Sequence, residues 1–201
     1  MENELENEII VTSEYGRREL RKQRTIILSG EIDTGTAHEF IEDMMILVKA
    51  GTEPITVVIT SPGGSAFAGF AIIRAIRYAQ RHGTKIIGSV YGQAMSMAFF
   101  ILQCCDERVM GQLCVLMAHG VTTGFVGDMR NVDAEKKLLT MWQLELAKLV
   151  SDRCTAKDSK YCVAEHWVEL LRDNTPQFYS AKESLDMGLV DKICDGKDED
   201  K

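Results

Sequence analysis

Three short segments carry side chains whose types and spacing could support nucleophilic chemistry, and the first of them contains Ser96. This serine lies in the run Gly92–Ala98, directly after the apolar, strand-like stretch Ile86–Tyr91 and at the start of an expected buried helix. The free N–H groups and the dipole at a helix N-terminus favour negative charge, and small neighbours let another backbone approach. A serine nucleophile requires such surroundings. Helix capping is the commoner role of a serine in this position, so the other two segments decide between the two interpretations.

The second segment is a glycine turn that could bind an oxyanion. Ser61–Ser65 follows the β-branched run Ile55–Thr60 and precedes the helical run Ala66–Arg81. A strand, a Gly-Gly turn and a helix in succession expose backbone N–H groups, which is what the stabilisation of an oxyanion needs. An ordinary tight turn is the alternative, because Gly-Gly pairs are common in turns.

The third segment ends at His119. This residue closes the apolar, strand-like run Val115–Ala118, and a histidine at the mouth of a buried strand is a candidate general base. A purely structural histidine is the alternative. Of the other histidines, two fall within expected helices and one closes a helix: His38, His166 and His82. Only His119 is therefore expected at a strand end.

Strands and helices are expected to alternate along the chain and to position these segments. The predicted strands are Thr25–Ser29, Ile55–Thr60, Lys85–Val90, Arg108–Met110, Val115–Ala118 and Leu189–Ile193. The predicted helices are Thr36–Ala50, Ala66–Arg81, Ser96–Cys104, Asn131–Asp152, Cys162–Arg172 and Ala181–Met187. Thr36 with Glu39 and Ser180 with Glu183 fit helix-capping boxes. This alternation predicts an α/β fold with a mainly parallel sheet.

Length and composition indicate one domain and limit its partners. The chain has 201 residues, of which 45% are hydrophobic, and a formal net charge of −7. This negative charge argues against nucleic acid and anionic membranes as partners. No apolar run reaches the roughly 20 residues that a membrane helix needs. The acidic start Met1–Glu6 lacks the order of a secretory signal, so a cytoplasmic location is expected.

Six cysteines are present, and the sequence favours free thiols. Three lie in apolar stretches and are predicted to be small buried hydrophobic residues: Cys104, Cys105 and Cys114. Cys154 and Cys162 flank the polar loop Thr155–Tyr161. A disulfide or a metal role for this pair is the less favoured interpretation, because the chain shows no export signal and no Cys/His quartet with zinc spacing.

Together these segments resemble the Clp protease proteolytic subunit family, the caseinolytic serine peptidases. Five pieces match in the family's order: Thr25–Ile32, Ser61–Ser65, Gly92–Ala98, Met117–His119 and Ser180–Asp191. The resemblance covers residues 24–193 and implies a ClpP/crotonase-like fold of stacked ββα units with a mainly parallel sheet and a protruding handle helix. It also implies an N-terminal arm over 1–23, similar to the family's axial loop, and a charged flexible tail over 194–201.

The resemblance further implies a self-compartmentalised serine endopeptidase that hydrolyses unfolded polypeptides or peptides with an ATP-driven AAA+ unfoldase. Ser96 would be the nucleophile and His119 the general base, with the N–H groups of Gly64 and Met97 forming the oxyanion hole. No metal or other cofactor is implied. The family assembles as two heptameric rings, so a homo-oligomer is expected, with the helix 131–152 and the segment Gly120–Phe125 at the contact between rings.

One position departs from the family's pattern. Pro176 occupies the place of the family's catalytic aspartate, and a proline cannot orient an imidazole. Asp173 is the preferred substitute because it carries a charge, although the loop must then shift. Asn174 is the alternative third residue, since it shares a face with position 176 in an extended chain.

Other functions stay open beside the peptidase. A Ser–His dyad, or a catalytically weak or inactive ring or scaffold subunit of the same fold, would also accommodate Pro176. A crotonase-type acyl-CoA enzyme is disfavoured, because the Ser96–His119 pair has no role in it. A membrane-anchored signal-peptide-peptidase relative is disfavoured, because no membrane span is expected.

Overall fold

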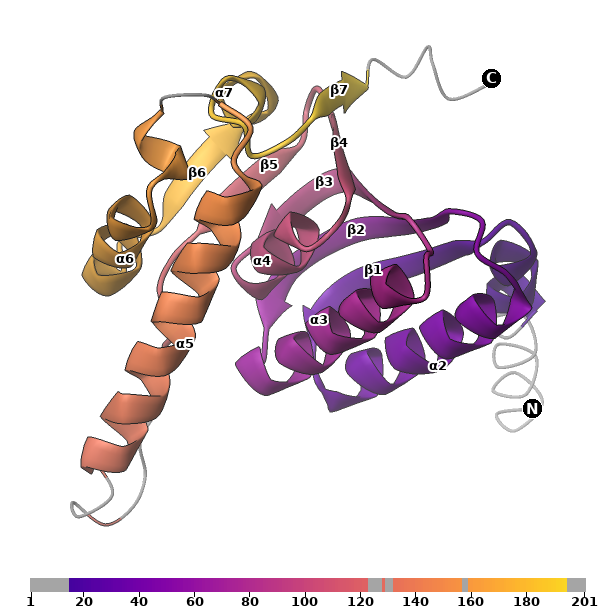
Figure 1. Ribbon diagram of the computed structural model, residues 1–201, viewed down its shortest axis with the longest axis horizontal. Coiled ribbons are helices and arrows are strands. Elements are labelled where there is room, and N and C mark those ends of the chain that lie inside the picture. Colours follow the sequence, from indigo (N-terminus) through magenta and orange to yellow (C-terminus); the bar gives the residue numbers. More distant parts are fainter. Residues whose placement is uncertain (1–14, 123–127, 129–131, 157–158, 195–201) are drawn as a thin grey trace, which may run out of the picture.

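A computed structural model describes the protein over residues 15–122, 128, 132–156 and 159–194. The strands are β1 (Thr25–Ile32), β2 (Ile55–Gly64), β3 (Ile86–Met95), β4 (Glu107–Gly111), β5 (Val115–Ala118), β6 (Gln177–Ser180) and β7 (Lys192–Cys194). The helices are α2 (Thr34–Ala50), α3 (Ala66–Arg81), α4 (Met97–Gln103), α5 (Val132–Arg153), the short 3-10 helix η2 (Lys160–Cys162), α6 (Ala164–Asp173) and α7 (Ala181–Asp186). Figure 1 shows α2, α3 and α4 running side by side along the sheet.

The strands form one mainly parallel sheet, which confirms the predicted α/β class. Its order is β1-β2-β3-β4-β7, with β5 joined to β3 and β6 joined to β5. All pairs are parallel except β5 with β6. Buried and less buried residues alternate along β1 and β2, as expected for strands with one face on a core.

Strand β3 forks the sheet and thereby brings two candidate residues together. Its first half pairs with β4 and its second half with β5. Gly92 lies between the halves with φ 85°, a conformation that favours glycine. β3 ends directly before Ser96 and β5 ends directly before His119. Because these two strands are parallel neighbours, both residues lie at the same, carboxyl-terminal end of the strands.

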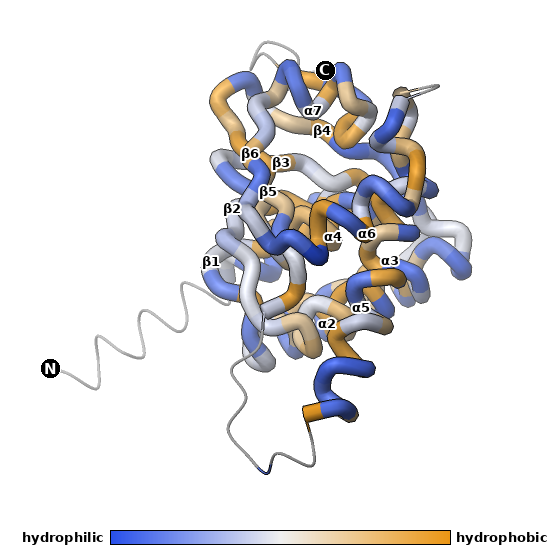
Figure 2. Tube along the Cα trace, turned by 90° about the vertical axis from the view of Figure 1, so that its left-hand side faces the viewer, coloured by the Kyte–Doolittle hydropathy of each residue, from blue (hydrophilic) through white to orange (hydrophobic). Residues whose placement is uncertain are grey.

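Helix α5 extends past the sheet (Figure 1). Its buried residues all belong to its C-terminal half: Leu146, Ala147, Val150 and Ser151. Hydrophilic and hydrophobic residues alternate along its outlying part (Figure 2), where Met141 and Leu144 are half exposed. No helix among the described residues combines the length and the apolarity that crossing a membrane requires.

Several local predictions change in the structure. The Thr36–Glu39 capping box is wrong, because Asp33 caps α2 and its Oδ1 accepts the Thr36 N–H at 2.8 Å. The Ser180–Glu183 capping box at α7 is confirmed. β2 continues to Gly64 and β3 to Met95, since both strands keep pairing beyond their apolar runs. β6 was not predicted, and it forms by pairing with β5.

The structure also corrects the prediction for Cys154 and Cys162, which form a disulfide. After α5 the chain reverses and η2 brings Cys162 back, so that the two Cα atoms lie 5.0 Å apart. The spacing in the sequence gives no sign of this reversal. The predicted burial of three cysteines is confirmed: Cys104, Cys105 and Cys114. Burial raises the pKa of the Cys104 thiol to about 12.

Part of the predicted N-terminal arm is a helix anchored to α2. Residues 15–22 are helical, and both Arg17 and Arg21 form ion pairs with the buried Asp43, at 3.0 Å and 3.2 Å. Residues 1–14, the second half of the predicted ring-contact segment Gly120–Phe125, and all but the first residue of the predicted tail 194–201 lie outside the described residues. The domain boundaries at 24 and 193 stay predictions.

Candidate active site

Ser96 lies on a sharp turn between β3 and α4. Its backbone has φ 52° and ψ −122°, a strained region for a residue with a Cβ atom. It occupies the N-cap position of α4, yet its side chain makes no capping hydrogen bond. The structure therefore does not support the capping alternative. A strained strand-to-helix turn that exposes a serine hydroxyl is typical of nucleophile elbows.

The glycine turn packs against this serine turn and holds it. The Ser96 N–H donates to the Met117 carbonyl at 2.8 Å. A Cβ atom on Gly63 would lie 2.6 Å from the Ser96 Cβ, so only glycine permits this approach. Ser61 Oγ fixes the turn, since it donates to the Gly30 carbonyl at 2.6 Å and accepts the Gly63 N–H at 3.0 Å. The sequence pattern predicts the glycine turn, but the roles of Ser61 and Gly63 depend on contacts with other strands that the pattern does not contain.

Gly64 and Met97, the predicted oxyanion-hole residues, line the same cavity as Ser96. Gly64 pairs with Ile32 of β1, and a Cβ atom on it would overlap the Ile32 carbonyl oxygen. Met97 is the first residue of α4, where backbone N–H groups lack intrahelical acceptors. Its side chain rests on Gly69, which has no room for a Cβ atom. Close packing thus fixes both candidate positions.

His119 is half buried, follows β5 and lines the cavity of about 300 Å³ that also contains Ser96. The register that pairs Met95 with Met117 brings the two residues to the same edge of the sheet. Among the hydrogen bonds of the described residues, none joins Ser96 Oγ to His119. The structure therefore brings the candidate nucleophile and base into one cavity without a bond between them.

The third candidate that lies beside His119 is Asn174. The His119 Nδ1 and the Asn174 Oδ1 are 3.4 Å apart. Asn174 caps the C-terminus of α6 in the left-handed region, with φ 59° and ψ 13°, a conformation that asparagine tolerates better than most residues. A Cβ atom on Gly120 would lie 3.1 Å from Asn174 Oδ1 and would overlap the Leu171 carbonyl. Glycine at position 120 therefore allows this approach.

The structure gives Asp173, the preferred third residue, no such contact. Asp173 is the last residue of α6 and is exposed, and it makes no hydrogen bond or ion pair with His119 among the described residues. The helix predicted over 162–172 ends one residue before the observed end of α6. Because α6 includes Asp173, the turn that follows it presents Asn174 to the imidazole. Pro176 is exposed and immediately precedes β6.

The cavity wall beside these residues is mainly apolar. Helix α5 contributes Glu135, Leu139, Trp142 and Leu146, which recur at helical spacing along one face. The Trp142 ring meets the Phe67 ring edge-on, with centroids 4.8 Å apart. Such a wall suits an apolar side chain of a ligand. Within the described parts of the chain, no group of three or more His, Cys, Asp or Glu residues could hold a metal ion.

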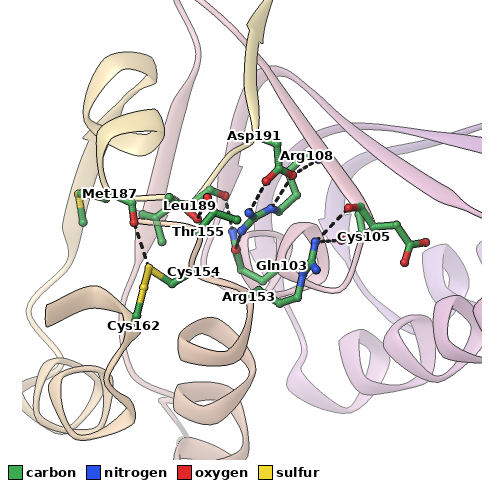
Figure 3. A network of polar contacts seen from close by, with 12 residues as sticks. Gln103, Cys105, Arg108, Arg153, Cys154, Thr155, Cys162, Met187, Leu189 and Asp191 are labelled. Carbon is green, nitrogen blue, oxygen red and sulfur yellow. Dashed lines mark hydrogen bonds and ion pairs between the residues drawn. A yellow bond between two sulfur atoms is a disulfide. The ribbon is translucent and has the colours of Figure 1, made fainter. Parts of the chain in front are cut away.

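An ion pair between a buried arginine and a partly buried aspartate supports the sheet (Figure 3). Arg108, which is fully buried, donates to both Asp191 carboxylate oxygens, at 2.7 Å and 3.0 Å, and to Gln103 Oε1 at 2.7 Å. Burial opposes the ionisation of Asp191, but the hydrogen bonds and charge of Arg108 outweigh it, so the pKa of Asp191 lies below its usual range. The pair joins β4 to the segment that leads into β7.

These features define an α/β protein with a mainly parallel sheet, in which a serine on a strained strand-to-helix turn shares a cavity with a histidine from the neighbouring strand. The model of the Clp protease family matches residues 10–197, and the chain belongs to this family. It is 28% identical over 174 residues to the "ATP-dependent Clp protease proteolytic subunit 2" of Treponema denticola, covering 85% of this chain and 82% of that protein. It is 29% identical over 179 residues to the "ATP-dependent Clp protease proteolytic subunit" of Chlorella vulgaris, covering 87% and 83%.

Proposed function

We propose that this chain is a serine-type endopeptidase subunit that hydrolyses peptides or unfolded polypeptides by acyl transfer. The observation that carries the proposal is the strained Ser96 turn in one cavity with His119, whose Nδ1 faces Asn174 Oδ1. Family membership supports the reaction class. The geometry of the cavity indicates which residues of this chain would carry out the reaction.

Asn174 would set the tautomer of the catalytic imidazole. Its Oδ1 can accept a hydrogen bond only from a protonated His119 Nδ1, which leaves Nε2 free to accept the Ser96 proton. Ser96 Oγ then attacks the scissile carbonyl, and His119 returns the proton to the leaving amine. Water hydrolyses the resulting acyl-enzyme by the same steps in reverse.

The N–H groups of Gly64 and Met97 would stabilise the oxyanion that forms on the carbonyl. They flank the serine in the cavity, and Met97 stands at a helix N-terminus where the dipole favours negative charge. The missing Ser96–His119 hydrogen bond is compatible with this role, because catalytic hydrogen bonds are often long without substrate and tighten when it binds. The apolar wall with Trp142 and Leu146 would accept an apolar substrate side chain.

The direct test is peptide hydrolysis by Ser96→Ala. Removal of one oxygen at a half-buried site leaves the packing intact, so the variant should assemble normally and lose hydrolysis of a fluorogenic peptide. Hydrolysis at the wild-type rate would overturn the assignment of Ser96. A crotonase-type enzyme would instead turn over an acyl-CoA thioester and leave the peptide intact.

We further propose a cytoplasmic homo-oligomer of two heptameric rings that receives polypeptide from an AAA+ unfoldase. The outlying part of α5 and the half-exposed Met141 and Leu144 support a contact between rings. The curated relatives are named ATP-dependent, which supports an ATP-driven partner. Analytical ultracentrifugation should show a particle many times the 22.5 kDa chain mass, and a stable monomer at micromolar concentration would refute the assembly.

An inactive scaffold subunit is the second candidate. Pro176 at the family's acid position and the missing Ser96–His119 hydrogen bond favour it. It predicts the same assembly as the peptidase, but with no hydrolysis in wild type and no difference in Ser96→Ala. The two candidate functions therefore predict different results in the activity assay and the same result in the sedimentation assay.

A further inference from the structure

Three segments meet at the Cys154–Cys162 disulfide (Figure 3). Cys154 directly follows α5, and Cys162 ends η2 two residues before α6 begins. The Cys154 Sγ lies 3.3 Å from the Met187 carbonyl oxygen, which follows α7. The loop after Cys154 packs closely against Gly188, the residue after Met187, because a Cβ atom on Gly188 would overlap the Thr155 backbone. The disulfide thus joins the helix that lines the cavity to the helix that carries Asn174.

The surroundings of the two sulfurs suit a dithiol as well as a disulfide. A disulfide sulfur has no hydrogen to donate, but a thiol does. If the bond were reduced, Cys154 could donate to the Met187 carbonyl at 3.3 Å and Cys162 to the Ala156 carbonyl at 2.9 Å. Each thiol would therefore have a backbone carbonyl as acceptor without any movement of the main chain. Both cysteines are only half buried, so a small thiol or disulfide can reach them.

We propose that Cys154 and Cys162 form a reversible redox site that controls how firmly α6 holds Asn174 against His119. In oxidation, one cysteine thiolate attacks a small-molecule disulfide and releases one small thiol. The second cysteine then attacks the mixed disulfide, forms the Cys154–Cys162 bond and releases the second thiol. Two electrons pass from the cysteine pair to the small disulfide, which ends as two thiols.

The connection from the disulfide to the site is a single helix. α6 runs from just after Cys162 to Asp173, and Asn174 caps its end. Away from the disulfide, α6 is held by the buried side chains of Trp167 and Leu171 and by the Gln143 side chain, which donates to the Leu171 carbonyl at 3.2 Å. Reduction would leave these contacts but free the first turn. The placement of Asn174 should then loosen without loss of the fold.

The catalytic part of this inference rests on the proposed function, so the test includes a readout that does not. The assembled full-length protein is equilibrated with dithiothreitol or with oxidised glutathione, and the disulfide is verified by intact mass. We expect reduction to lower the melting temperature by several degrees, to increase hydrogen exchange in α6, and to lower kcat for a peptide several-fold. Re-oxidation should reverse all three effects.

Two variants make the test specific. The double variant Cys154→Ser/Cys162→Ser should behave like the reduced protein under both conditions. Cys194→Ser, which changes another half-buried cysteine, should keep the full redox response. The proposal is overturned if oxidised glutathione does not form the disulfide, or if the double variant matches the oxidised protein in exchange and melting.

The two proposals fail in different ways. If peptide hydrolysis is absent under both conditions while exchange in α6 still responds to redox state, the proposed function fails and control of α6 stands. If hydrolysis is present but neither it nor α6 responds to redox state, only the redox site fails.

Discussion

Replacement of Asn174 by aspartate tests the role that we propose for this side chain beside His119. The substitution keeps the size and shape of the side chain, and aspartate also tolerates the left-handed conformation found at position 174. It places a carboxylate oxygen about where Asn174 Oδ1 lies, 3.4 Å from His119 Nδ1. Asn174→Asp should therefore still set the tautomer and should also stabilise the imidazolium that forms during catalysis.

The size of the effect follows from this distance. Two unit charges 3.4 Å apart attract by about 1 kcal/mol in water, and Asn174 is exposed enough for the aqueous value to apply. A barrier lower by about 1 kcal/mol corresponds to a rate increase of roughly fivefold. The acid limb of the kcat/KM profile should move to higher pH, because the added carboxylate favours the protonated imidazole.

Steady-state hydrolysis of a fluorogenic peptide from pH 5 to 9 measures both effects. Asn174→Ala should lower kcat at least tenfold, since it removes the group that we propose to select the tautomer of His119. Asp173→Ala is the matched control and should stay within about twofold of wild type, because a surface side chain without a contact contributes little. If Asn174→Ala retains the wild-type rate, or if Asp173→Ala is the variant that fails, the reasoning about Asn174 is refuted.

Further outcomes follow from the glycine turn, the Arg108–Asp191 ion pair and the apolar cavity wall. Gly63→Ala should abolish hydrolysis, because the added Cβ would lie 2.6 Å from the Ser96 Cβ. Gly30→Ala is the control: Gly30 also has a positive φ, but no atom lies within 4 Å of its added Cβ, so this variant should lose stability without losing hydrolysis. Asp191→Asn should cost about 3 kcal/mol in denaturant unfolding, since it leaves Arg108 buried without its charge partner. Because the pKa of Asp191 is lowered in the folded state, ionised Asp191 stabilises the wild-type protein at a pH above the ordinary carboxyl range, and this stabilisation is lost as the pH falls through the lowered pKa. The melting temperature of Asp191→Asn should lack this dependence on pH. Trp142→Ala should raise KM for peptides with a bulky apolar residue more than it lowers kcat; an unchanged KM would show that this wall does not bind substrate.

Local patterns were sufficient to predict the main elements. The β-branched run at Ile55–Thr60 and the apolar run before Ser96 lie in strands, and the helices that follow them begin close to the predicted residues. A strand followed by a glycine turn or a small-residue run and then a helix is encoded in one continuous stretch of sequence. The predicted juxtaposition of Ser96 and His119 also follows from a general rule, because parallel strands share an edge at which their following residues meet.

Features that depend on tertiary contact could not be predicted in the same way. The choice of Asn174 over Asp173 depends on a single residue at the end of α6, and helix ends are the least certain part of a pattern. The need for glycine at position 63 arises from the Ser96 turn, which approaches it from another strand. The Cys154–Cys162 bond depends on a reversal of the chain that no periodicity marks.

The central claim is that Ser96 is an activated nucleophile, and covalent labelling tests it most directly. The full-length protein is incubated with a fluorophosphonate, and the modified residue is mapped by peptide mass spectrometry. We expect one adduct per chain on Ser96, which should be lost in Ser96→Ala and form more slowly in Asn174→Ala, because that variant lacks the group facing His119. Absence of an adduct on Ser96 in folded wild-type protein, or equal labelling of Ser96 in wild type and in a variant lacking His119, would contradict the claim.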